Sequence, residues 1–161
     1  TVTSVYMTDG SSAATEIDKS ISAVDESESW QISCGRTNRT QVTRNRANAS
    51  LTETHTNPDG TQVVQVYTNG LLCSSTAKSS GGATVSWRGY AHDVYGRVVT
   101  ETEPAANGDT RTTTFAYNAA GNVTNIAVSA GGIEQGTAKW WDEMGRLERV
   151  VLSRSPKATG L

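Results

Sequence analysis

Histidine, aspartate and serine, the residue types of a nucleophilic Ser-His-Asp site, all occur in this chain. His92 and Asp93 are adjacent, whereas His55 stands alone in the sequence. Because adjacent residues of a strand point to opposite faces, Asp93 would not orient the imidazole of His92. We therefore predict no catalytic role and assign both residues to a repeated turn, described below.

Cysteines and acidic residues also lack the spacing of a metal site. Cys34 and Cys73 lie far apart and outside any Cys-x-x-Cys pair, unlike the ligands of a structural zinc site. Two buried free thiols are the preferred interpretation, and a disulfide between them is the alternative. Asp59, Asp93 and Asp142 lack the clustered oxygen ligands that Ca²⁺ requires. We expect no metal and no cofactor.

Two adjacent tryptophans are the best candidates for ligand contact. Trp140 and Trp141 would place one ring on each face of a strand. An exposed ring can stack on a sugar, so both are candidate glycan contacts, although packing between repeats is favoured for Trp141.

A short phrase recurs three times, in residues 90–98, 115–123 and 139–147. It consists of a ring, Asp or Asn, two variable positions, Gly, usually Arg, and an aliphatic residue. Its glycines are separated by 25 (121 − 96) and 24 (145 − 121) residues. A fixed period of this length indicates a repeat architecture.

Each position of the phrase suits a hairpin turn. Gly adopts positive φ without steric cost, and the Asp or Asn side-chain oxygen can accept hydrogen bonds from backbone amides of the turn. The Arg can bridge to a carboxylate of its own turn or of a neighbouring turn. The rings are expected to stack on rings of neighbouring hairpins. The predicted turn residues are Asp93, Gly96, Arg97, Asn118, Gly121, Asp142, Gly145 and Arg146. The predicted repeat rings are Tyr90, His92, Phe115, Tyr117 and Trp141.

Between the turns, short segments rich in Val and Thr predict an all-β fold of antiparallel hairpins. A weaker copy covers residues 56–63, with its glycine at Gly60, and Asn69-Gly70 is a second turn signal, so the register there stays open. Residues 13–24 carry Ile17, Ile21 and Val24 at helical spacing, which makes a short helix an alternative. The strands are predicted at 28–34, 40–44, 51–56, 61–67, 71–76, 83–92, 97–103, 111–117, 122–129, 137–141 and 146–152.

The amino-acid composition further narrows the class of protein. Only 35% of the 161 residues are hydrophobic and 6% aromatic, a small supply for a compact core. The formal net charge of −2 gives no basic excess, which argues against a nucleic-acid partner. No run approaches the ~18 apolar residues of a membrane span.

The phrase resembles the YD repeats of the RHS family, which also occur in C components of bacterial toxin complexes and in teneurins. The likeness is good over 88–152, looser over 54–87, and slight over 1–53. In that family the hairpins form a curved sheet that spirals into a hollow shell around a C-terminal toxin. The resemblance implies hairpin repeats over 54–152, an N-terminal region 1–53 of unclear repeat status, and a tail, 153–161.

We therefore expect a non-catalytic structural segment of such a shell, secreted or at the cell surface, and a fragment of a larger protein. Its partners would be the rest of the parent polypeptide and the enclosed segment. The alternative is a carbohydrate-binding adhesin module that uses exposed Trp and Tyr. Unpaired edge strands predict self-association.

Overall fold

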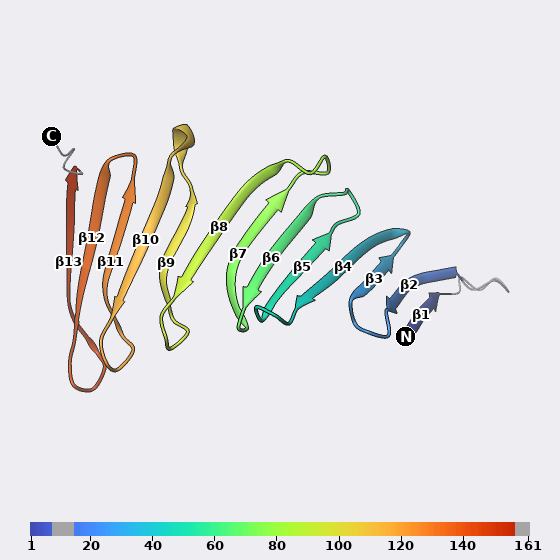
Figure 1. Cartoon of the computed structure of the whole chain (residues 1–161), viewed down its shortest axis with the longest axis horizontal. Coiled ribbons are helices and arrows are strands. Elements are labelled where there is room, and N and C mark those ends of the chain that lie inside the picture. Colours follow the sequence, from blue (N-terminus) through green and yellow to red (C-terminus); the bar gives the residue numbers. More distant parts are fainter. Residues whose placement is uncertain (8–14, 157–161) are drawn as a thin grey trace. The chain divides into compact units, whose positions relative to one another are not determined.

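The computed structural model describes residues 1–7 and 15–156, which form thirteen β-strands (Figure 1). The strands follow one another in chain order in an antiparallel sheet, β1 to β13. The all-β prediction of antiparallel hairpins is confirmed. Because every connection joins neighbours, each strand pairs with its predecessor and its successor, and β1 and β13 are the two ends of the order.

The chain divides into two compact units, Thr1–Ser86 and Trp87–Leu161. In the first unit each strand pairs with the next from β1 to β7. Its strands are β1 (Val2–Met7), β2 (Thr15–Ser22), β3 (Glu28–Ser33), β4 (Arg36–Asn45), β5 (Ser50–Thr56), β6 (Gln62–Thr68) and β7 (Leu71–Lys78).

The second unit contains the three copies of the phrase. Its strands are β8 (Thr84–His92, which begins in the first unit), β9 (Val98–Pro104), β10 (Thr110–Tyr117), β11 (Val123–Ala130), β12 (Ile133–Trp141) and β13 (Leu147–Pro156). A single 3₁₀ turn, Ala106–Gly108, lies between β9 and β10.

The helix considered for residues 13–24 is wrong within the described part, because Thr15–Ser22 is strand β2. Ile17 and Ile21 are four residues apart, and this spacing keeps two side chains on one side of a helix or of a strand. Pairing with β1 and β3 satisfies the backbone hydrogen bonds of β2, and this pairing makes the segment a strand. Residues 13 and 14 lie outside the described residues.

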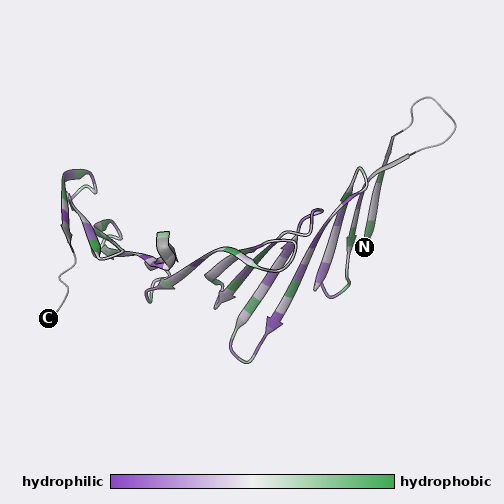
Figure 2. Ribbon diagram, turned by 90° about the horizontal axis from the view of Figure 1, so that it is seen from above, coloured by the Kyte–Doolittle hydropathy of each residue, from purple (hydrophilic) through white to green (hydrophobic). Residues whose placement is uncertain are grey.

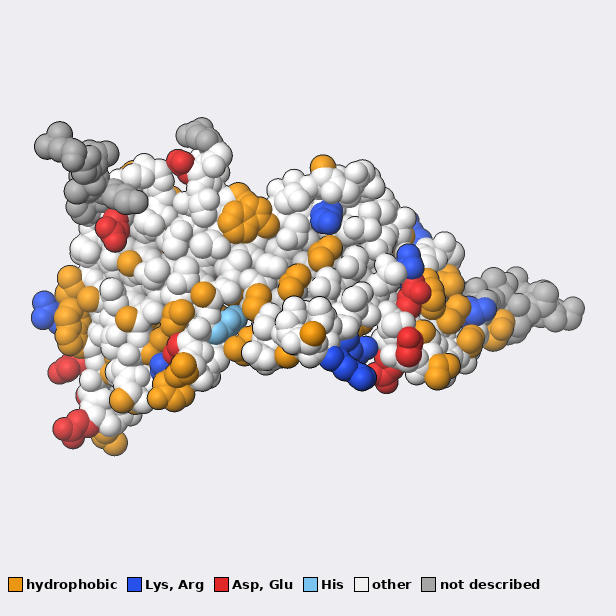
Figure 3. All heavy atoms as spheres, in the orientation of Figure 1, with side chains coloured by type: hydrophobic (Ala, Val, Ile, Leu, Met, Phe, Trp, Pro, Cys, Tyr) orange, Lys and Arg blue, Asp and Glu red, His pale blue; other side chains and the backbone are white. Residues whose placement is uncertain are grey.

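The residues whose burial is described form no hydrophobic core. None of the residues whose burial the structure describes is buried, and the ribbon of each unit is a single layer (Figure 2). Hydrophobic side chains lie in the open on the strands (Figure 3). The cysteines are free thiols, but Cys34 is exposed and Cys73 half-buried, so the expectation of burial is wrong. Among the described residues, no helix has the length and apolarity to cross a membrane.

Candidate functional site

The three phrase turns share one backbone geometry. Asp93 N–H donates to the Arg97 carbonyl at 2.9 Å, and Gly96 N–H donates back to the Asp93 carbonyl at 3.0 Å. The same two hydrogen bonds close the turns 118–122 and 142–146, at 2.9 to 3.0 Å. Gly96, Gly121 and Gly145 each have positive φ. This pattern is a five-residue connection that returns the chain antiparallel to itself.

In two of these turns, an Asp side chain accepts hydrogen bonds from amides of its own turn. Asp93 Oδ1 accepts from the amides of Tyr95 at 2.9 Å and Arg97 at 3.0 Å, while Arg97 Nε donates to Oδ2 at 2.7 Å. Asp142 makes the equivalent contacts, with Arg146 Nε at 2.7 Å. Each guanidinium thus pairs with the carboxylate of its own turn.

The middle copy keeps only the neutral part of this network. Asn118 Oδ1 accepts from the Asn122 amide at 2.9 Å, and no charged pair is possible there because both residues are amides. Acid and base are therefore absent together in this copy, and the turn keeps its backbone geometry without them.

Hydrogen bonding lowers the pKa of Asp142. The Arg146 amide has the largest effect, followed by the Arg146 side chain, and both favour the ionised carboxylate over partial desolvation. At Asp93, desolvation is the largest single influence and raises the pKa, but the combined hydrogen bonds to Arg97 and Tyr95 outweigh it and the pKa is lowered.

The lowered pKa of Asp142 predicts that the 142–146 turn becomes less stable at acid pH. A carboxyl whose folded pKa is below its unfolded value stabilises the turn above about pH 4, and this is lost as pH falls through the folded pKa. We expect the amides of Met144 and Arg146 to lose exchange protection on acidification, measured by NMR. The Asn122 amide, held by an uncharged Asn118, is the internal control. Equal loss at all three amides would contradict the assignment.

Two rings of the phrase connect successive hairpins. Tyr117 on β10 donates its hydroxyl to the Val98 carbonyl of β9 at 2.6 Å. Trp141 on β12 donates its indole N–H to the Val123 carbonyl of β11 at 2.8 Å. The ladders between these strands stop short of the turns, at Thr100 and Asn125, so the rings satisfy carbonyls that the backbone leaves unpaired.

Tyr117 has a guanidinium beside its ring, where the sequence had suggested a second ring. The Arg97 guanidinium lies 4.4 Å from the centre of the Tyr117 ring and 5.0 Å from that of Tyr95. A Cβ added at Gly121 would lie 4.0 Å from Arg97 Nη1. The residue that ends one turn thus packs against the ring and glycine of the next.

Two further predicted rings, Tyr90 and Phe115, lie further from the turns along their strands. Tyr90 is opposite Glu101, and Phe115 is opposite Ile126. Neither residue takes part in the contacts that join one phrase turn to the next.

A β-bulge accompanies every ring that precedes a phrase turn. The ladder register shifts just before His92, Tyr117 and Trp141, and the same shift precedes Tyr67 and Tyr6. We call the strand that carries the ring the ring strand and the strand after the turn the return strand. A bulge bends the strand locally and increases its twist.

Tyr67 is the repeat residue that sequence reasoning missed. It precedes His92 by one repeat period, so its spacing was the available signal. The local copy at Asn57 has the same turn hydrogen bonds, to Thr61 and from Gly60, both at 2.9 Å. That turn joins β5 to β6, however, and the ladder between these two strands has no register shift before the turn. The ring register therefore runs through Tyr67 and the Asn69-Gly70 turn.

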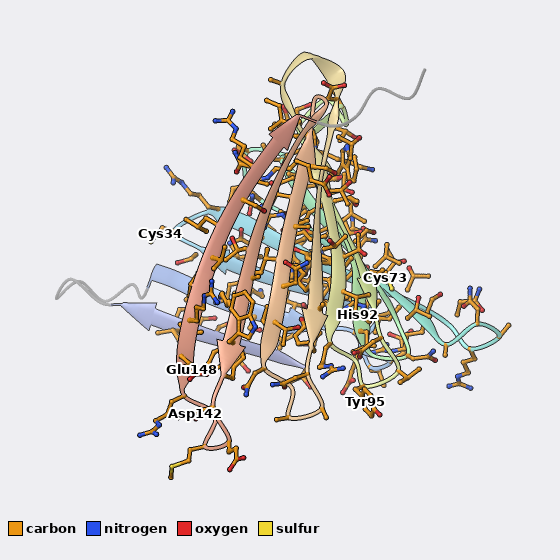
Figure 4. The ribbon with its side chains drawn as sticks, turned by 90° about the vertical axis from the view of Figure 1, so that its left-hand side faces the viewer. Cys34, Cys73, His92, Tyr95, Asp142 and Glu148 are labelled. Carbon is orange, nitrogen blue, oxygen red and sulfur yellow. The ribbon has the colours of Figure 1, made fainter. Side chains whose placement is uncertain are left out.

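The tryptophans differ in accessibility. Trp141 is half-buried with its indole N–H bonded to Val123, whereas Trp140 is 44% exposed. The Arg149 guanidinium lies 5.0 Å from the Trp140 ring centre. The most open ring is Tyr95, 80% exposed at the β8–β9 turn (Figure 4). It lines a depression of about 320 Å³ with Arg97 and the 118–121 turn.

The histidines occupy different surroundings. His92 fills the ring position before the first phrase turn, while the Asp93 carboxylate is engaged by its own turn. His55 Nδ1 lies 2.9 Å from Thr40 Oγ1, and its Nε2 lies 3.3 Å from Glu53 Oε1. Thr40 on β4 lies directly opposite His55 on β5, and Glu53 is two residues away on β5, so the three side chains share one face of the sheet.

Comparisons with known proteins add no identity. No protein-family model matches the chain, and no curated protein matches it significantly. Within residues 1–7 and 15–156, no group of three or more His, Cys, Asp or Glu side chains is placed to hold a metal ion.

Proposed function

We propose that this chain is a non-catalytic structural segment of an RHS-like shell, which encloses or displays a toxin or effector segment at the cell surface or outside the cell. The observation that carries the proposal is a single-layer sheet without a buried residue among those described. Protein domains ordinarily bury one face of a sheet against a second layer. A sheet of this kind needs something else to cover it.

The links between hairpins also support a wall. Tyr117 and Trp141 make equivalent donor bonds to Val98 and Val123, so the connection is repeated and can be extended. In repeat proteins, stability accumulates through such nearest-neighbour contacts and does not require a central core. The role is mechanical, and the partners are the parent polypeptide and the segment it encloses.

The native gene product tests this proposal. An antibody against the chain should detect a polypeptide several times its length, containing a segment that resists added protease. Deletion of one repeat, residues 118–141, should make that segment cleavable, whereas Trp140→Ala, which preserves the repeat spacing, should leave it protected. A native product of only this length, or protection that survives the deletion, would refute the wall.

Exposed aromatic rings support a second candidate, a carbohydrate-binding adhesin module. Trp140 and Tyr95 both present accessible rings, and the depression beside Tyr95 is also lined by Arg97 and residues 118–121. Rings of this kind stack on sugar faces. Glycan binding that disappears in Trp140→Ala or Tyr95→Ala would favour the adhesin over the wall.

A further inference from the structure

Among the described residues, the last phrase turn lacks the ring donor that completes the contact between the earlier hairpins. Val98 and Val123 each follow a turn glycine by two residues and accept a ring donor. Leu147 occupies the same position after Gly145, at the start of β13. The Arg146 side chain is 76% exposed, whereas Arg97, which has Tyr117 beside it, is only 30% exposed. Arg146 and Leu147 thus form an acceptor half-site for a ring that carries a donor.

The opposite end of the strand order carries the matching half. Strand β1 is a ring strand, because the register of its ladder with β2 shifts just before Tyr6. Tyr6 is 58% exposed, and Val2 and Val5 on the same strand are 61% and 50% exposed. Its hydroxyl is the same kind of donor as that of Tyr117.

We propose that β1 of a second molecule pairs antiparallel with β13, with the Tyr6 hydroxyl donating to the Leu147 carbonyl. In the second unit, a return strand is followed by a ring strand at β9–β10 and at β11–β12. Strand β13 is a return strand and β1 is a ring strand, so the contact between molecules repeats the order found within one. The proposal concerns the two end strands of the 161-residue chain. Within a longer polypeptide, the same rule would place the ring strand of the next repeat against Leu147.

The internal ladders fix the register of this contact. At both internal joints, the residue three before the ring pairs with the residue two after the acceptor: Thr114 with Thr100, and Ala138 with Asn125. The same rule places Thr3 opposite Arg149 and Val2 opposite Val150. Val150 is 46% exposed, so the contact brings two open valines together as a cross-strand pair.

A symmetric β13–β13 contact fits less well. It would leave both Leu147 carbonyls without a ring donor and would place a return strand beside a return strand. Head-to-tail pairing uses two different surfaces, so each added molecule exposes a new β13 edge and association continues. The two residues brought face to face, Val2 and Val150, do not carry the charge that commonly protects an edge strand.

Sedimentation of the 161-residue chain tests the association. We expect assemblies that grow with concentration, and Val150→Lys should shift them to monomer because it places a charge opposite Val2. Val94→Lys, at a turn position that is 94% exposed, is the matched control and should change nothing. Tyr6→Phe removes only the hydroxyl and should weaken association about fivefold. A monomer at every concentration, or equal effects of the two lysines, would overturn the proposal.

Cysteine cross-linking tests the partner and the register, even if a substitution disturbs folding elsewhere. In a Cys34→Ser, Cys73→Ser background, a mixture of Val2→Cys chains and Val150→Cys chains should give disulfide-linked dimers on oxidation. Directly opposite strand residues have the separation that a disulfide requires. Val2→Cys mixed with Arg149→Cys is the out-of-register control and should not cross-link. Dimers formed by Val150→Cys alone would instead establish a symmetric β13 contact and overturn the proposal.

Discussion

Tyr117→Ala is expected to weaken the joint between the β8–β9 and β10–β11 hairpins by roughly 2 to 3 kcal/mol. The change removes one hydrogen bond to Val98, about 1 kcal/mol, one cation–π contact, about 0.5 to 1 kcal/mol, and the packing of a half-buried ring. Because none of the described residues is buried in a core, packing elsewhere does not compensate for this loss at the β9–β10 interface. Exchange protection in the β9–β10 ladder should fall about 30- to 140-fold, measured by NMR.

Tyr95→Ala is the matched control for this change. The Tyr95 ring lies 5.0 Å from the same guanidinium but is 80% exposed and bridges no strands, so its loss should leave the β9–β10 ladder protected. Tyr117→Phe isolates the hydroxyl and should cost about 1 kcal/mol. If Tyr95→Ala and Tyr117→Ala had equal effects, the ring-to-carbonyl bond would not be what joins the hairpins.

The turns and the fold class were predictable because their causes are local. A glycine at positive φ and an Asp or Asn three residues earlier determine a five-residue turn with little help from the rest of the chain. The 25-residue spacing then implies that the turns recur in one sheet. These signals lie in adjacent residues, and they could be read at Asp93, Asn118 and Asp142 without coordinates.

The contacts between hairpins were not predictable, because they depend on where the ladders stop. Nothing near Tyr117 indicates that its hydroxyl reaches Val98, since this requires a bulge before the ring and a ladder that ends at Thr100. A ring therefore suggested stacking on rings, while the structure gives a polar bridge. The strand at 15–22 was ambiguous for the same reason, because neighbouring ladders decide its conformation.

Gly121→Val is expected to destabilise the β10–β11 hairpin by about 2 kcal/mol, or about 30-fold in its formation. Gly121 has φ of +86°, a conformation that a β-branched residue adopts only under strain. The nearest side-chain atom to an added Cβ would be Arg97 Nη1 at 4.0 Å, so space is available and the cost arises in the backbone. Loss of protection in the β10–β11 ladder should report it.

Ala120→Val is the control, since it adds a larger side chain at the neighbouring exposed position without a positive φ. Gly121→Asn should be intermediate, because Asn tolerates the left-handed region better than Val. The turn is the shared element of all three copies, so Val at position 121 should also separate Arg97 and Tyr117 from their contacts in the next hairpin. A Gly121→Val chain with wild-type protection in β10 and β11 would show that the repeated glycine is not needed to form the hairpin.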